Sequence, residues 1–235
     1  MIGALLFTGY VVLVFNESMK SLAIIFYLCI ISGPTFADTD GIVFRFDESQ
    51  KLPEKTFDRV ISIMEETFSS HAEASGRKLE FMTDYDADWA QAFARRWETD
   101  QVIVYGGVAA LPSINEDVLA LLLCHELGHL YGGMPWGDEY NKLSLEGQAD
   151  YWSPLCFKKV LPKLSVRVSP LRLQEAALIL TAFYADNRKL PHPGVSTPDI
   201  SVVETTNQTH PLPQCRLDTI LSGDALRARP ACWYR

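Results

Sequence analysis

Residues 125–129 read His-Glu-Leu-Gly-His and follow a strongly apolar stretch of the chain. Two histidines four positions apart lie on one face of a helix, one turn from each other. The side chains of His125 and His129 can therefore bind one metal ion, and such a pair on a helix is typical of zinc sites. Glu126 lies about 100° around the helix from His125, where its carboxylate can take a proton from a water molecule on the zinc.

The motif stands near the end of a predicted helix over residues 114–131. Ser113 and Glu116 fit a capping box in which Ser113 is the N-cap, and Gly132 follows the last turn. Gly128 has no side chain, so another segment can approach the helix closely there. The alternative is a purely structural core helix, but Glu126 would then need a buried partner.

A catalytic zinc site needs three protein ligands and one open position, and the chain has only five histidines. A third histidine six positions after His129 is excluded, because Pro135 stands there. Glu146 is the predicted third ligand. Asp150, one helical turn further on, is predicted to accept a hydrogen bond from the far nitrogen of His125. The alternative for these two carboxylates is a solvated acidic face, which the apolar residues around them disfavour.

Three motifs in this order make the chain similar to a gluzincin metallopeptidase. Residues 146–150 read Glu-Gly-Gln-Ala-Asp and match the ExxAD motif of one family. That family includes the CAAX prenyl proteases, the HtpX-type membrane proteases and their soluble, exported relatives. His210-Pro211 is followed by Arg216, six positions after the histidine, as in that family. The resemblance covers about half of the chain.

The resemblance implies a fold and a role for each matched residue. The implied zinc ligands are His125, His129 and Glu146. Glu126 would be the general base, Asp150 would orient a ligand, His210 would steady the oxyanion, and Arg216 would brace the carboxylates. The implied fold is a zincin-like α+β domain with an active-site helix, a small antiparallel sheet and a mostly helical C-terminal half.

The sequence therefore predicts a zinc-dependent endopeptidase that acts on a protein or peptide substrate. An alternative from another class is a zinc-dependent binding or chaperone-like module that retains the site without useful turnover. A disulfide-bonded structural protein without metal is a third possibility, which the full ligand set disfavours. The net charge of −8 and the lack of basic runs argue against a nucleic-acid partner. The sequence indicates no oligomeric state.

Residues 1–37 are predicted to be a signal peptide, of which 1–18 are an upstream extension. Lys20 precedes an apolar stretch at 21–32, and residues 35–37 read Thr-Phe-Ala, a small-residue cleavage site. These features predict export to the periplasm or secretion.

The alternative to a signal peptide is a membrane anchor built from residues 1–32. After cleavage, residues 38–235 are predicted to form a single zincin-like metallopeptidase domain. No apolar run after residue 40 reaches the roughly 20 residues that a membrane span takes, so no stable span is expected after signal removal.

Four cysteines remain after residue 37, namely Cys124, Cys156, Cys215 and Cys232. An even number in an oxidising compartment indicates two disulfides, and four cysteines allow three pairings. The favoured pairing is Cys124–Cys156, which would tie the HELGH helix to the segment after EGQAD, with Cys215–Cys232, which would pin the C-terminal tail.

The remaining pattern predicts further helices and strands. Helices are expected at 54–74 and 170–186, a strand at 79–82, and a hairpin of strands at 91–97 and 101–106. The Pro-rich stretch 190–213 is expected to be irregular.

Further expectations concern the helix of Glu146 and the substrate cleft. Ser144 can cap that helix, and Pro154 is expected to break it. The strand at 101–106 is expected to be the sheet edge that binds an extended substrate. Gly106-Gly107 could let the substrate backbone approach closely, or could form a plain turn. The loop at 134–140 is expected to border the cleft.

Overall fold

Helix α1, Glu54–Glu73, opens the part of the chain that the computed structural model describes, residues 51–164 and 171–235. Phe57, Val60, Met64 and Phe68 recur at helical spacing and are buried, so one face of α1 lies on the core. The helix predicted at 54–74 is confirmed. The predicted signal peptide lies outside the described residues.

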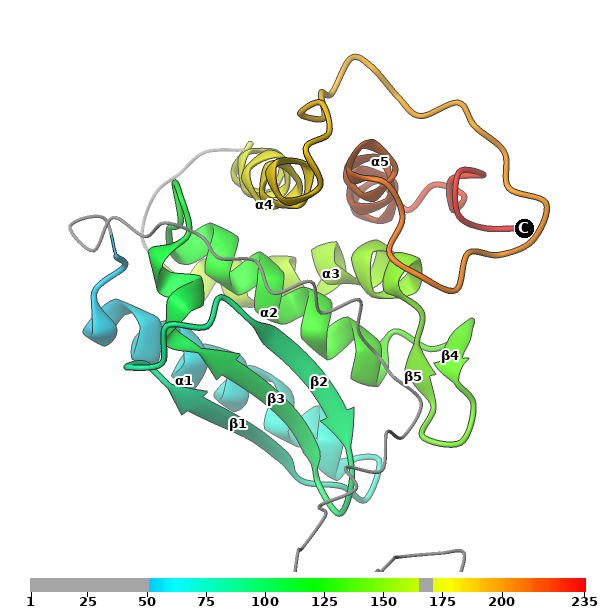
Figure 1. The fold of residues 1–235 in the computed structure, drawn as a ribbon. Coiled ribbons are helices and arrows are strands. Elements are labelled where there is room, and N and C mark those ends of the chain that lie inside the picture. Colours follow the sequence, from blue (N-terminus) through cyan, green and yellow to red (C-terminus); the bar gives the residue numbers. More distant parts are fainter. Residues whose placement is uncertain (1–50, 165–170) are drawn as a thin grey trace, which may run out of the picture. The chain divides into compact units, whose positions relative to one another are not determined.

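The first sheet has the strand order β1-β3-β2, with strands at Leu79–Asp84, Asp100–Tyr105 and Ala92–Arg96 respectively. β3 pairs parallel with β1 and antiparallel with β2. The predicted hairpin is therefore present, but the expectation that its second strand is the edge is wrong, because β3 is paired on both sides. In Figure 1, α1 lies behind this sheet. Helix α2, residues Glu116–Tyr131, runs along β2, which is one of the two edge strands of the sheet.

Gly106 and Gly107 do not face an open cleft. They begin a short 3-10 helix, Gly106–Ala110, that follows β3. A Cβ on Gly106 would lie 1.7 Å from the carbonyl oxygen of Tyr85, and one on Gly107 would lie 2.3 Å from that of Asp88. The backbone that approaches these two glycines closely is therefore that of residues 85 and 88 of the same chain. It leaves no room for a substrate backbone at this place.

Helix α2, Glu116–Tyr131, is buried along nearly its whole length. Its N-cap is Asn115 rather than Ser113. Asn115 has extended backbone, and its side-chain oxygen accepts hydrogen bonds from the N–H groups of Asp117 and Val118 at 3.0 and 3.1 Å. Ser113 has a φ of 59°, outside the extended conformation that an N-cap takes.

Helix α3, Glu146–Val160, crosses α2 at close range. A Cβ on Gly128 would lie 2.8 Å from the Cα of Ala149, so only glycine lets the two helices meet this closely. The Cys124–Cys156 disulfide joins the same two helices. Between them, β4 at Trp136–Asp138 and β5 at Leu143–Ser144 form a two-stranded antiparallel sheet, and β4 lies within the loop 134–140 that is predicted to border the cleft.

Two predictions for α3 are wrong. Ser144 does not cap the helix; its hydroxyl donates to the Gly133 carbonyl at 2.7 Å, and Leu145 occupies the N-cap position. Pro154 does not break the helix, which continues to Val160. Proline has no N–H for the carbonyl of Asp150, and the hydroxyl of Ser153 donates to that carbonyl instead, at 2.9 Å.

Helices α4, Arg172–Arg188, and α5, Pro213–Asp224, complete an α+β fold whose C-terminal half is mostly helical (Figure 1). α4 lies against α2 and α5, and α5 lies against α3. The stretch 190–212 is irregular, as predicted, but the sequence reading missed α5. None of the described helices is long and apolar enough to cross a membrane.

Candidate metal centre

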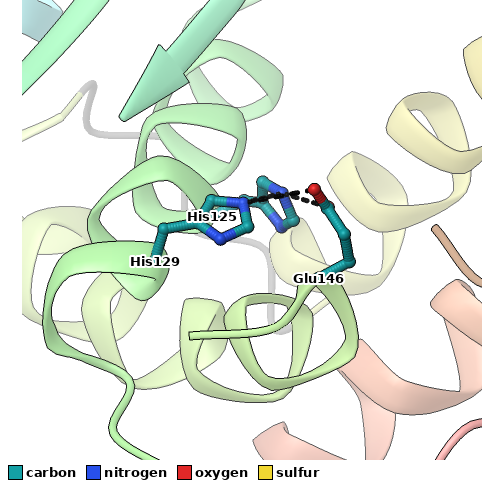
Figure 2. Close-up of side chains that lie close together, drawn as sticks. All are labelled: His125, His129 and Glu146. Carbon is teal, nitrogen blue, oxygen red and sulfur yellow. Dashed lines mark hydrogen bonds and ion pairs between the residues drawn. The ribbon is translucent and has the colours of Figure 1, made fainter. Parts of the chain in front are cut away.

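Three side chains converge where α2 and α3 cross (Figure 2). The Nε2 atoms of His125 and His129 lie 3.2 Å apart. The carboxylate of Glu146, at the first residue of α3, reaches both: Oε2 is 3.2 Å from Nε2 of His125, and Oε1 is 3.6 Å from Nε2 of His129. The ligand set predicted from the sequence is thus assembled around one point.

The spacing of these atoms fits a tetrahedral zinc ion. Zinc holds nitrogen and oxygen ligands at about 2.0–2.2 Å, which places ligand atoms roughly 3.3–3.6 Å from one another. The separation of the two Nε2 atoms, 3.2 Å, and the distances of 3.2 and 3.6 Å from them to Oε2 and Oε1 of Glu146 lie in or just below this range. Glu146 Oε2 is buried and accepts no hydrogen bond from the described residues, which is the condition of a carboxylate oxygen reserved for a cation.

The tautomers of the two histidines support the same conclusion. Nδ1 of His129 lies 2.8 Å from the carbonyl oxygen of Ser144, and Nδ1 of His125 lies 2.8 Å from Oδ1 of Asp150. Both oxygens act as acceptors, so the protons sit on Nδ1 and the lone pairs of Nε2 face each other and Glu146. Two lone pairs and a carboxylate at this range require a positive charge between them.

The histidine pKa values reflect the same crowding of acceptors. Burial works to lower the pKa of His125, but Asp150 and Glu146 outweigh it and hold that pKa well above its ordinary value. Burial lowers the pKa of His129, which keeps this ring neutral. In the absence of a metal, a proton on His125 therefore supplies the positive charge, and metal binding would release it.

Asp150 and Arg216 form a buried support behind His125. Arg216, on α5, donates from Nε to Oδ2 of Asp150 at 2.8 Å and from Nη2 to Oδ1 at 2.9 Å. Tyr184 of α4 covers the guanidinium, whose central carbon lies 3.8 Å from the ring centre. Burial works to raise the pKa of Asp150, but Arg216 and His125 keep it below its ordinary value. The carboxylate is thus ionised and holds the imidazole in one orientation.

Glu126 lies on the other side of the ligands, next to strand β2. Its side chain is buried, and the N–H of Ala94 donates to its carboxylate. Burial raises the pKa of Glu126 to about 8, and the charge of Glu146 acts in the same direction. A carboxylate with a raised proton affinity, beside the ligand set, has the character of a general base.

The backbone of β2 presents hydrogen-bonding groups on this side. Tyr105 donates its N–H to the Gln91 carbonyl, and Trp97 donates to that of Thr99. Hydrogen-bonded pairs alternate along an antiparallel ladder. The N–H and C=O groups of Ala92 and Ala94 therefore point away from β3, and the N–H of Ala94 meets Glu126.

His210 also reaches the cluster, from the irregular stretch before α5. Its Nε2 lies 3.2 Å from Oε1 of Glu146, and its side chain is 47% exposed. Burial of the ring lowers the pKa of His210 to about 4, so the imidazole is neutral near pH 7 and its Nε2–H can donate. All seven residues named from the sequence motifs thus lie together.

The cysteines form the two predicted disulfides, Cys124–Cys156 and Cys215–Cys232. Among the described residues, Asp199 with Cys215 and Cys232 also has metal-ligand spacing, but the two sulfurs are bonded to each other. Sequence reasoning missed three contributors to the site: Tyr184, the carbonyl of Ser144 and the N–H of Ala94. The latter two are backbone groups, which every residue type carries, so the sequence cannot indicate that they belong to the site.

No protein-family model, curated protein or solved structure matches this chain. The resemblance to gluzincins therefore rests on the three sequence motifs.

Proposed function

We propose that this chain is a zinc-dependent endopeptidase of the gluzincin type, exported to the periplasm or secreted. The observation that carries the proposal is the convergence of His125, His129 and Glu146 with their acceptor atoms facing one point, beside the buried carboxylate of Glu126. Two histidines and one carboxylate are a typical catalytic zinc set. The two disulfides support an oxidising compartment.

Zinc at this point would supply a Lewis acid that acidifies water and polarises a peptide carbonyl. Glu126 would take a proton from the attacking water and pass it to the leaving amine. The neutral ring of His210 would donate its Nε2–H to the negative charge that develops on the carbonyl oxygen. Asp150 and Arg216 would keep His125 in place throughout.

Strand β2 would bind the substrate. The N–H and C=O of Ala92 and the C=O of Ala94 point away from β3, so an extended peptide could pair with these groups as an added strand, while the N–H of Ala94 faces Glu126. This replaces the strand at 101–106, which the sequence reading had assigned to substrate binding.

The test uses the exported chain, residues 38–235, purified with its disulfides formed. We expect about one zinc ion per chain in the wild type and loss of that zinc in Glu146→Ala. Glu126→Gln should retain zinc but cleave an unfolded protein substrate about 10²–10⁴-fold more slowly, because it removes the proton acceptor. Glu139→Gln is the control, since it makes the same substitution at an exposed residue in the turn between β4 and β5.

Two outcomes would contradict the proposal. A wild type without zinc, even after zinc is added back, would eliminate a metallopeptidase. Zinc in the wild type, together with a Glu126→Gln variant that behaves like Glu139→Gln in every assay, would instead indicate the binding or chaperone-like module.

A further inference from the structure

Residues 229–235, here named the C-terminal clamp, contact residues that adjoin the candidate metal ligands in the chain, namely Gly147 and Gln148. Trp233 is fully buried, in a small cluster with Cys215 and Cys232 that is separate from the main hydrophobic core. Tyr151 and Tyr234 pack against this cluster. The neighbours of this buried tryptophan show which part of the fold it supports.

The indole ring of Trp233 lies directly against the backbone of Gly147. A Cβ on Gly147 would lie 2.3 Å from Cδ2 of the ring and 2.5 Å from Cε3. Gly147 follows Glu146, the carboxylate ligand at the start of α3. The Nε1–H of the indole has no hydrogen-bond partner among the described residues, so the ring acts on this backbone through its shape.

The same residue holds the segment that carries His210. The carbonyl oxygen of Trp233 accepts a hydrogen bond from the N–H of Asn207 at 2.7 Å. The hydroxyl of Thr206 donates to the carbonyl of Arg235 at 2.8 Å. Trp233 therefore contacts Gly147, the neighbour of Glu146, through its ring, and Asn207, three residues before His210, through its carbonyl.

Arg229 extends the contact to α2. Its Nε donates to Oε1 of Gln148 at 2.7 Å, and Nε2 of Gln148 donates to the carbonyl of Gly132 at 2.7 Å. Gly132 caps the helix end that carries His129. The guanidinium of Arg229 also lies over the rings of Tyr151 and Tyr234, at 5.2 and 4.8 Å.

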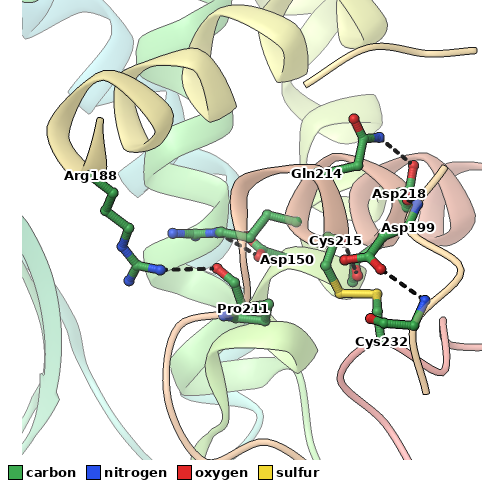
Figure 3. The surroundings of a disulfide bond; sticks show 11 residues. Asp150, Arg188, Asp199, Pro211, Gln214, Cys215, Asp218 and Cys232 are labelled. Carbon is green, nitrogen blue, oxygen red and sulfur yellow. Dashed lines mark hydrogen bonds and ion pairs between the residues drawn. A yellow bond between two sulfur atoms is a disulfide. The ribbon is translucent and has the colours of Figure 1, made fainter. Parts of the chain in front are cut away.

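The Cys215–Cys232 disulfide fixes the clamp to α5 (Figure 3). Cys215 directly precedes Arg216, whose guanidinium holds Asp150 and, through it, His125. The figure draws Asp150 and Pro211, the residue after His210, among the surroundings of the disulfide. The clamp thus reaches all three ligands and His210, although none of its own residues touches the metal position.

We infer that the C-terminal clamp is a positioning element of the metal centre, and that Trp233 is the residue through which it sets the place of Glu146. The inference rests on the proposed zinc site and adds to it the element that holds the third ligand. Trp233 is a positioning residue, since it acts through Gly147 and Asn207 rather than on the metal or the substrate.

The test measures zinc affinity by competition with a chromophoric chelator, in the oxidised chain 38–235. Trp233→Ala should weaken zinc binding by about 10–100-fold, the usual cost of losing a residue that supports a ligand. Trp233→Phe, which keeps a flat ring against Gly147, should restore most of the affinity. In the cobalt(II)-loaded protein, Trp233→Ala should also change the visible absorption bands, because they report the coordination geometry.

Gly147→Ala gives a second, independent arm. The added Cβ cannot coexist with the indole, so this variant should weaken zinc binding in the wild-type background. In the Trp233→Ala background the same change should cost little, because its obstacle is gone. Such non-additivity is the signature of two residues in direct contact.

Val60→Ala is the control for a general loss of stability. Val60 is fully buried in α1, so its truncation destabilises the core, yet it should leave the zinc affinity and the cobalt spectrum unchanged. The inference is overturned if wild type binds zinc and Trp233→Ala binds it equally well, or if the effects of Gly147→Ala and Trp233→Ala simply add. A wild type that binds no zinc at all removes the proposed function together with it.

Discussion

The two disulfides of this chain each include a cysteine that directly precedes a residue of the candidate metal centre, and they lie in different surroundings. Cys124–Cys156 lies inside the main hydrophobic core, where α2 and α3 are already held together by burial and by the close contact of Gly128 with Ala149. Cys215–Cys232 lies in a small cluster whose third buried member is Trp233. The first cross-link reinforces a contact that packing makes anyway, whereas the second carries most of the restraint on its segment.

This difference separates stability from site geometry. In the core region, a lost contact costs free energy of unfolding but leaves His125 and His129 on the same rigid helix. In the region of the C-terminal clamp, a lost contact removes little of the core but releases the backbone beside Glu146. Variants in the two regions should therefore differ in how stability and zinc affinity respond.

Asp150→Ala should give the largest effect, because Asp150 is the residue where the two regions meet. It leaves Arg216 buried without its carboxylate, and breaking a buried ion pair costs about 3–5 kcal/mol. It also frees the ring of His125, for which we expect a loss of about 10–100-fold in zinc affinity. Urea unfolding and chelator competition measure the two losses separately.

Asp117→Ala is the matched control for this variant. Asp117 forms a buried ion pair with Arg172 near the start of α2, with Nε of Arg172 2.7 Å from Oδ2. Its loss should also lower the free energy of unfolding but leave zinc affinity unchanged. Equal losses of zinc affinity in Asp117→Ala and Asp150→Ala would mean that the metal centre responds only to overall stability.

The pairing of Asp150 with His125 also shows how much of the site the sequence could predict. Two site residues on the same helix can be predicted to lie side by side from their spacing alone. His125 and His129 lie one turn apart on α2, and Glu146 and Asp150 lie one turn apart on α3. Helices α1 and α4, the irregular stretch and the favoured disulfide pairing could also be predicted. Each of these rests on residues close in sequence or on a small count of possible pairs.

The features that could not be predicted depend on how distant segments pack. Strand order decided that β2 and not β3 is the edge, and nothing in either strand's sequence specifies it. The contact of Trp233 with Gly147 joins residues far apart in the chain. α5 was missed because Pro213 was read as the end of a Pro-rich stretch, although proline is favoured at the first position of a helix.

Removal of each disulfide in turn tests the comparison directly. The sequence separations of 32 and 17 residues predict losses of about 4 and about 3 kcal/mol from loop-closure entropy alone. Cys124→Ala with Cys156→Ala should therefore destabilise the chain slightly more than Cys215→Ala with Cys232→Ala. Zinc affinity should follow the opposite order, with a clear loss only in the second pair.

The opposite order makes the experiment informative. If zinc affinity depended only on the free energy of unfolding, the Cys124/Cys156 double variant would lose more zinc affinity than the Cys215/Cys232 double variant. Cys124 precedes His125 in the sequence, just as Cys215 precedes Arg216, so proximity to a site residue does not distinguish the pairs. Equal zinc affinity in both double variants would show that the clamp is held by packing and not by its disulfide.

Asn115→Ala should give the smallest effect and marks the limit of the core region. Loss of an N-cap costs about 1 kcal/mol, and it acts at the far end of α2 from the histidines, so zinc affinity should not change. Ser113→Ala is the control: its hydroxyl caps nothing in the structure, and we expect a change within roughly 0.5 kcal/mol. Thermal or urea unfolding of both variants distinguishes them. If Ser113→Ala proved the more damaging, the capping box expected from the sequence would be correct, and α2 would begin two residues earlier than in this structure.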